Sequence, residues 1–219
     1  MCTQKVPGAA LRGGEPNAYR KRMDRMAYSL ILASASPRRR ELMAYTGVPY
    51  QVITADAEEI KTGEPETLVM ENARRKAQAV WRRHPDSAVL GADTVVYQNG
   101  SVLGKPKDQA DAKDMLRSLS GAWHTVYTGV CLITPDGKED VRCDASRVRF
   151  VPLTDADIDW YIASGEPMDK AGAYAVQGRA GMYVSRIEGS YSNVIGLPMH
   201  LVRDMLKKAG LMNLSFFEN

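Results

Sequence analysis

The 219-residue sequence is poor in cysteine and aromatic residues, and it has no hydrophobic run long enough to cross a membrane. Its three cysteines, Cys2, Cys131 and Cys143, contain no CxxC pair and would leave one thiol over in any disulfide scheme. A reducing, cytoplasmic location is therefore expected. The three histidines are scattered and share no ligand spacing with the cysteines, which argues against zinc and favours a hard cation held by carboxylates.

Several common catalytic motifs are also missing. The sequence contains no GxxxxGK[ST], GxGxxG, HExxH or GxSxG pattern. A P-loop, a dinucleotide-binding turn, a zincin helix and a hydrolase nucleophile elbow consequently have no support.

The net charge of +3 is not spread along the chain. Six basic and two acidic residues lie in 1–27, which leaves 23 basic and 24 acidic residues in the remainder. Such a near-neutral body lacks the basic face that binds nucleic acid. Residues 1–27 are polar and have no apolar core of a secretory signal, so we expect an extension that is disordered or outside the domain. A short ordered arm packed on the body is the alternative.

From residue 28 the pattern becomes that of a single α/β domain over 28–212, with a mixed sheet and flanking helices. Strands are predicted at 29–33, 50–54, 88–90, 94–97, 102–103, 126–134, 141–151 and 182–187. Helices are predicted at 38–46, 65–83, 108–119, 154–163 and 197–209. Asn99-Gly100 is the strongest hairpin signal.

The first candidate site is the segment 34–41, Ser-Ala-Ser-Pro-Arg-Arg-Arg-Glu, where a strand ends and a helix begins. Ser36 suits the N-cap and Pro37 the first helical turn. Free backbone N–H groups and the positive end of the helix dipole, with Ser34 and the arginines Arg38 and Arg39, favour an anion pocket. A capped helix with solvated arginines explains the same residues about equally well.

The second candidate is Gly91-Ala-Asp-Thr94, which we place at the end of a buried strand. A carboxylate there suits a metal ligand or general base, although a turn-forming aspartate is the commoner use. Lys105 in Gly104-Lys-Pro106 is a rigidly presented ammonium suited to phosphate. Glu59 in the preceding acidic loop is ambiguous between metal binding and simple solvation.

The third candidate is the glycine-framed segment 169–178, Asp-Lys-Ala-Gly-Ala-Tyr-Ala-Val-Gln-Gly, read as a short β-like run. It ends at Gln177, whose amide both donates and accepts, as recognition of a base edge requires. An edge strand with an exposed amide is the plainer explanation.

Together these segments resemble the Maf family of nucleotide pyrophosphatases. The resemblance covers about residues 29–207 and rests on ordered motifs at 32–39, 71–77 (Glu-Asn-Ala-Arg-Arg-Lys-Ala), 91–96, 104–106, 169–178 and 196–198. It implies a three-layer α/β fold related to the inosine triphosphatase group, with the substrate in a cleft between two lobes and commonly a homodimer. Residues 1–27 have no counterpart in the family.

The resemblance also implies an activity and residue roles. A nucleoside triphosphate would be cut to its monophosphate and pyrophosphate with Mg²⁺ or Mn²⁺. Arg38, the pair Asp93-Thr94 and Gln177 match the branch acting on dTTP and UTP; the 7-methyl-GTP branch typically has Trp after Ser-Pro, then Asp-Gln and Glu. The resemblance implies that the phosphates are bound by Ser34, Ser36, Arg38, Arg39 and Lys105. Glu59 and Lys76 would line the cleft, and Glu59 could also contact the metal. Asp93 would act in catalysis or bind the metal, and the base would be selected by Arg38, Thr94 and Gln177.

Three matters stay open at this point. The sequence does not rank dTTP, UTP, CTP and modified pyrimidine nucleotides. A house-cleaning role toward non-standard nucleotides is one use of such an activity. A non-catalytic nucleotide-binding regulator of septation is the alternative function, and it would bind UTP without releasing pyrophosphate.

Overall fold

The computed structural model describes residues 29–212, so the expected extension at 1–27 lies outside the described part of the chain. No helix among these residues is long and apolar enough to span a membrane. The predicted α/β class is confirmed, and a seven-stranded mixed sheet forms its centre.

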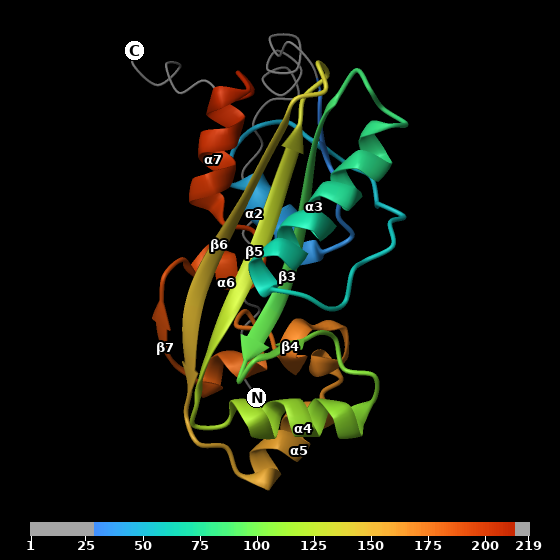
Figure 1. Ribbon diagram of the computed structural model, residues 1–219. Coiled ribbons are helices and arrows are strands. Elements are labelled where there is room, and N and C mark those ends of the chain that lie inside the picture. The colour runs from blue at the N-terminus through green and yellow to red at the C-terminus, as the bar shows by residue number, and fades with distance from the viewer. Residues whose placement is uncertain (1–28, 213–219) are drawn as a thin grey trace, which may run out of the picture.

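The sheet runs in the order β2-β1-β3-β5-β6-β7, with β4 paired to β3 (Figure 1). β1 is parallel to β2 and β3, and the other pairings are antiparallel. The strands are β1 (Leu30–Leu32), β2 (Gln51–Val52), β3 (Ala88–Gln98), β4 (Ser101–Leu103), β5 (Trp123–Ile133), β6 (Glu139–Phe150) and β7 (Val184–Glu188).

Helices cover both faces and one end of this sheet (Figure 1). The α-helices are α2 (Pro37–Ala44), α3 (Pro65–Trp81), α4 (Gln109–Leu119), α5 (Asp155–Ala163), α6 (Tyr191–Ile195) and α7 (Met199–Lys208). Three short 3₁₀ turns follow α5, namely η1 (Glu166–Asp169), η2 (Ala171–Ala173) and η3 (Arg179–Tyr183).

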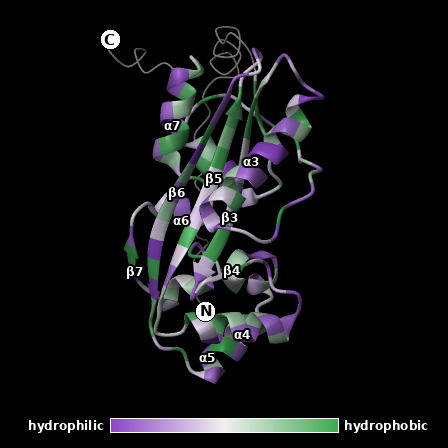
Figure 2. Cartoon of the chain, in the orientation of Figure 1, coloured by the Kyte–Doolittle hydropathy of each residue, from purple (hydrophilic) through white to green (hydrophobic). Residues whose placement is uncertain are grey.

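The core follows the alternation of the central strands, whose residues are largely hydrophobic (Figure 2). On one face, apolar residues of β1, β3 and β5 pack against α2, α6 and α7. On the other face, the intervening residues of the same strands pack against α3. Further along the strands, α4, α5 and the 3₁₀ turns enclose a separate apolar cluster. The result is a three-layer body with a second packed unit at one end.

Glycines set the distance between α3 and the sheet. A Cβ on Gly91 would lie 2.4 Å from the Ala73 carbonyl oxygen, and a Cβ on Gly129 would lie 2.3 Å from that of Val69. Side chains at these two positions would therefore push the helix off the strands. The absence of side chains lets α3 lie directly on β3 and β5.

This packing corrects one prediction. Gly91-Ala-Asp-Thr94 was expected to follow the end of a strand, but it lies inside the continuous strand β3. The prediction was wrong because a glycine within an apolar run can mark close approach of another backbone as well as a turn. Asp93 consequently sits in the middle of a strand and is only 8% exposed.

The segment 169–178 was also misread as a β-like run. It begins at the last residue of η1, contains the turn η2 and continues as an irregular stretch. Gly172 has a φ of 64° and Ala173 a φ of 58°, and these left-handed conformations interrupt any strand. The glycines here bend the chain.

The edge of β3 beside β1 is only partly paired. β1 pairs with residues 88–90 of β3, and β4 pairs with residues 96–98. Within the described chain no strand pairs with residues 91–95 on this edge. α2 begins after a short connection, residues 33–36, and the hydrogen bond from Arg39 in its first turn to Thr94 places the N-terminus of that helix beside this unpaired stretch.

Candidate active site

Arg39 lies at the junction between β1 and α2. Ser36 is the N-cap of α2, as predicted, and its hydroxyl accepts from the Arg39 backbone N–H. The Arg39 side chain turns back toward the sheet. Its Nε donates to the Gly196 carbonyl oxygen (2.7 Å), its Nη2 to Thr94 Oγ1 (2.9 Å) and its Nη1 to Ser34 Oγ (3.4 Å).

The groups that hold Arg39 are all neutral. Thr94 Oγ1 is also 3.0 Å from Thr128 Oγ1, and the Thr128 hydroxyl donates to the Asn193 carbonyl oxygen. Among the described residues Arg39 forms no ion pair at salt-bridge distance. Burial lowers its pKa from the ordinary value, and the nearby Asp93 carboxylate opposes that shift. The guanidinium is therefore oriented by dipoles while its charge stays uncompensated by direct contact.

Asp93 lies on the opposite face of β3, against α3. Its Oδ1 is 2.7 Å from Lys76 Nζ, and its Oδ2 accepts from Asn72 Nδ2 (3.0 Å). Lys76 Nζ is also 2.7 Å from Glu59 Oε1. Lys76 and Asp93 are largely buried, whereas half of the Glu59 side chain is exposed. Two carboxylates thus share one ammonium.

The pKa of Glu59 places other cations in this neighbourhood. Partial burial disfavours its ionised form, but the hydrogen bond and charge of Lys76, with the charges of Lys105 and Arg39, hold its pKa below the usual range. Lys105 makes no direct ion pair with any described residue, although its charge reaches Glu59. Arg39 and Lys105 are thereby linked electrostatically to the Asp93 group.

Asp93 and Thr94 join the two groups because they are consecutive residues of β3. Successive strand side chains point to opposite faces, so Asp93 meets α3 while Thr94 meets Arg39. Both residues lie in the stretch of β3 that has no strand partner on the β1 edge. The carboxylate and the guanidinium therefore lie on opposite faces of this edge.

In the described chain, no side-chain hydrogen bond or ion pair joins Arg38 or Gln177 to Asp93, Thr94 or Arg39. Arg38 contributes to lowering the pKa of Asp169, behind the larger effect of the Asp169–Lys170 hydrogen bond and against the effect of burial. No side-chain hydrogen bond links Gln177 to the other predicted site residues in the described chain. Its Oε1 is buried without a hydrogen-bond partner.

Glu166 fixes the loop that carries Gln177. Its Oε1 accepts from the Tyr161 hydroxyl (2.9 Å) and its Oε2 from the Arg179 backbone N–H (3.1 Å). Gly178 permits this contact, since a Cβ there would lie 2.3 Å from Glu166 Oε1. The loop position of Gln177 is thus set by a carboxylate that the sequence motifs did not single out.

Sequence reasoning missed several other residues of the site. Asn72 was quoted within a motif but given no role, and Thr128 and Asn193 were not considered. A signal existed for Asn72, because it stands four residues before Lys76 and so shares its helix face. Nothing local marked Thr128, whose part depends on the pairing of β5 with β3.

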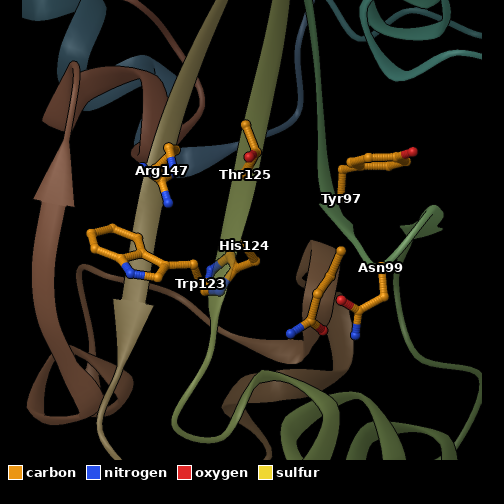
Figure 3. A pocket seen from close by; sticks show the side chains of 7 residues that line it. Tyr97, Asn99, Trp123, His124, Thr125 and Arg147 are labelled. Carbon is orange, nitrogen blue, oxygen red and sulfur yellow. The ribbon is translucent and has the colours of Figure 1, made fainter.

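A separate cavity of about 250 Å³ contains none of the predicted site residues. Figure 3 shows Tyr97, Trp123 and Arg147 around it, contributed by β3, β5 and β6. The Arg147 guanidinium carbon lies 4.4 Å from the centre of the Trp123 ring. None of these side chains forms a hydrogen bond or ion pair with the Asp93 or Arg39 groups in the described chain.

The fold and the site define an α/β protein with a buried strand carboxylate beside a helix-start arginine. The chain belongs to the Maf family, since the family model described as Maf-like protein matches residues 29–209.

Similar proteins support this membership. A dTTP/UTP pyrophosphatase of Symbiobacterium thermophilum is 49% identical over 183 residues, covering 83% of this chain and 94% of that protein. One from Deinococcus radiodurans is 44% identical over 183 residues, covering 83% and 93%. A HAM1 protein from Coxiella burnetii is 13% identical and covers 83% of this chain and 99% of that structure, with a TM-score of 0.49; that likeness is too distant to support a functional conclusion.

Proposed function

We propose that the protein hydrolyses pyrimidine nucleoside triphosphates, dTTP and UTP first, to the monophosphate and pyrophosphate. The observation that carries this proposal is the placement of Asp93 and the Arg39-binding Thr94 as neighbours on β3, beside the N-terminus of α2. The names of the Maf relatives at 44–49% identity point to the same reaction.

The chemistry follows from this placement. Water attacks the α-phosphorus, the bond from that phosphorus to the bridging oxygen breaks, and pyrophosphate leaves with the electron pair. Asp93 orients the water and accepts its proton. Arg39 and Lys105 stabilise the negative charge that grows on the phosphate oxygens, and Ser34, Ser36 and Arg38 add donors at the helix start.

The carboxylates of the site fit a divalent metal. Mg²⁺ commonly uses one or two protein carboxylates and takes its remaining ligands from phosphates and water. Asp93 and Glu59 already converge on Lys76 Nζ, and among the described residues no group of three acidic, histidine or cysteine side chains could enclose an ion. Bound Mg²⁺ or Mn²⁺ would supply Lewis-acid stabilisation of phosphate charge.

Base selection is assigned to Arg38, Thr94 and Gln177. The buried, unpaired Oε1 of Gln177 is a hydrogen-bond acceptor that gains from a partner. Thr94 binds Arg39, which is proposed to contact the phosphates. Thr94 would therefore influence which base is accepted by fixing the position of the bound nucleotide. CTP and modified pyrimidine nucleotides belong to the same proposal, as does a house-cleaning role.

The proposal includes a cytoplasmic location and a homodimer, which the family resemblance implies. Sedimentation of the purified protein at two concentrations tests the dimer. A single species with the mass of one chain would contradict it.

The decisive experiment is a nucleotide panel with pyrophosphate detection, run with Mg²⁺, Mn²⁺ or Co²⁺ and with a chelator. We expect the fastest release from dTTP or UTP and none with the chelator. Preference for a purine nucleotide would contradict the substrate assignment. Binding of UTP with no pyrophosphate released over hours would instead favour the regulator of septation.

A further inference from the structure

We propose that Asn72 is a positioning residue that holds both Asp93 and the loop bearing Glu59 in their working arrangement. The inference rests on the proposed function, because it concerns the reaction assigned to Asp93. Asn72 belongs to the 71–77 motif, in which only Lys76 has been given a role.

The Asn72 side chain uses both of its amide hydrogens and one lone pair of its oxygen in hydrogen bonds. It is 2% exposed, its Oδ1 accepts from the Ile60 N–H (2.8 Å), and its Nδ2 donates to the Ile60 carbonyl oxygen (2.9 Å). The second amide hydrogen of Nδ2 is directed at Asp93 Oδ2 (3.0 Å). An asparagine that only anchored the loop would need Ile60 alone, so the bond to Asp93 is an additional constraint.

That additional bond fixes the rotation of the Asp93 carboxylate. Lys76 holds one oxygen and Asn72 the other, from positions one helical turn apart on α3. Each carboxylate oxygen keeps a further lone pair for a water or a cation. A neutral amide achieves this orientation without adding charge, whereas a carboxylate at position 72 would repel Asp93.

The bonds to Ile60 act on Glu59, the preceding residue. The loop between β2 and α3 has no helix or strand over residues 53–61, and Glu59 is half exposed. Pairing of both Ile60 backbone groups with one buried amide restricts the backbone beside Glu59. Its carboxylate therefore stays at 2.7 Å from Lys76 Nζ.

The test compares Asn72→Ala and the nearly isosteric Asn72→Asp with Arg75→Ala. Arg75 also joins α3 to the same loop, through the Glu58 carbonyl oxygen (3.4 Å), but it does not contact Asp93. For each variant, kcat and KM are measured with UTP, affinity is measured with the non-hydrolysable α,β-imido analogue, and thermal unfolding is recorded.

We expect both Asn72 variants to lower kcat about 50-fold, with KM and analogue affinity within threefold of the parent protein, and Arg75→Ala to stay within twofold throughout. In an Asp93→Asn background, Asn72→Ala should cause no further loss. Three results would each overturn the inference. The first is a kcat of Asn72→Asp within threefold of the parent protein. The others are a loss of analogue affinity as large as the loss of kcat in the Asn72 variants, and a loss of kcat in Arg75→Ala as large as theirs.

The unmodified protein separates this inference from the proposed function. If it releases pyrophosphate from no nucleotide, the proposed function fails and the inference fails with it. If it is active and the Asn72 variants are unimpaired, only the inference fails. Should Asn72→Ala not fold, Asn72→Asp and the uncharged Asn72→Ser decide the outcome together, and a kcat within threefold of the parent in either variant would overturn the inference.

Discussion

The charged groups on the two faces of β3 have different partners, although they lie at neighbouring residues of the strand. On the α3 face, Asp93 has an ammonium and an amide in direct contact, and the ammonium is shared with a second carboxylate. On the other face, Arg39 is held by two hydroxyls and a carbonyl oxygen. The Arg39 guanidinium, which only neutral groups hold, is free to pair with an anionic ligand. The Asp93 carboxylate is already paired, and its partners fix its orientation. The comparison assigns orientation of the attacking water to the first face and electrostatic interaction with the phosphates to the second.

Replacing the carboxylate should have the largest effect. We expect Asp93→Asn to lower kcat by about 10³-fold, in the range for loss of a general base, while nucleotide binding survives because the cations are intact. Steady-state kinetics and calorimetry with the α,β-imido analogue measure the two quantities. Asp136→Asn, in the exposed β5–β6 turn, is the matched control. Full activity of Asp93→Asn would remove the base assignment.

Arg39→Lys should have the next largest effect. Lysine keeps the charge but cannot reproduce three donors in a fixed fork, so we expect kcat/KM to fall about 10²-fold, with KM rising. Arg40→Lys is the control, because Arg40 is exposed and its side chain makes one hydrogen bond within the described chain, to the Ala35 carbonyl oxygen. A loss confined to kcat would break the distinction between the two faces.

The acid sensitivity of the fold should be traced to His124 and kept apart from the catalytic carboxylate. His124 is 3% exposed, its Nε2 is 2.7 Å from the Tyr174 hydroxyl, and burial lowers its pKa to about 4. An unfolded histidine titrates near pH ~6.5. Between these values only the unfolded chain binds the proton, so stability is complete above about pH 6.5 and falls as the pH falls toward 4.

From pH 7 to 5 this linkage amounts to about 2 kcal/mol. We expect His124→Gln, which does not titrate, to lose about 2 kcal/mol less over that interval than the parent protein. Urea unfolding at pH 7, 6 and 5 measures the difference, and the exposed His200→Gln serves as control. Parallel losses in parent and His124→Gln would show that another group controls acid stability.

The smallest predicted effect concerns the hydroxyl that supports Arg39. Thr94→Val keeps the shape of the side chain but removes the acceptor for Arg39 Nη2 and the contact with Thr128. We expect kcat/KM for UTP to fall about fivefold, equivalent to about 1 kcal/mol, which is typical of one hydrogen bond. Kinetics of Thr94→Val and of Thr134→Val, at the far end of β5, check this. An unchanged value would show that the guanidinium is held by Gly196 and Ser34 alone.

Local rules explain what the sequence predicted correctly. Ser36 and Thr154 cap their helices, and Asn99-Gly100 forms the β3–β4 turn with φ values of 50° and 80°. Each feature depends on residues within a few positions of one another. The junction of β1 with α2 could be predicted for the same reason, and with it the placement of Arg39 at the start of a helix.

Tertiary contacts explain what the sequence did not predict. Gly91 was placed at the end of a strand because nothing in its neighbours reveals that α3 passes over it. The bond between Asn72 and Asp93 spans 21 residues and depends on that same passage. The loop at Gln177 is held by Glu166, 11 residues earlier in the chain, through a bond to the Arg179 N–H that no motif reveals. The charged and polar residues of the site could therefore be predicted from the sequence more easily than the residues that hold them in place.

The close contact of α3 with Gly91 and Gly129 leaves no room for a side chain between this helix and the sheet. Any methyl group added along that line would shift Lys76 and Asn72 together, so folding and turnover would decline in step. Changes that alter substrate choice without loss of stability should therefore be found in the loops on the Arg39 and Gln177 side. In a selection for variants with new substrates, we therefore expect Gly91 and Gly129 to remain unchanged.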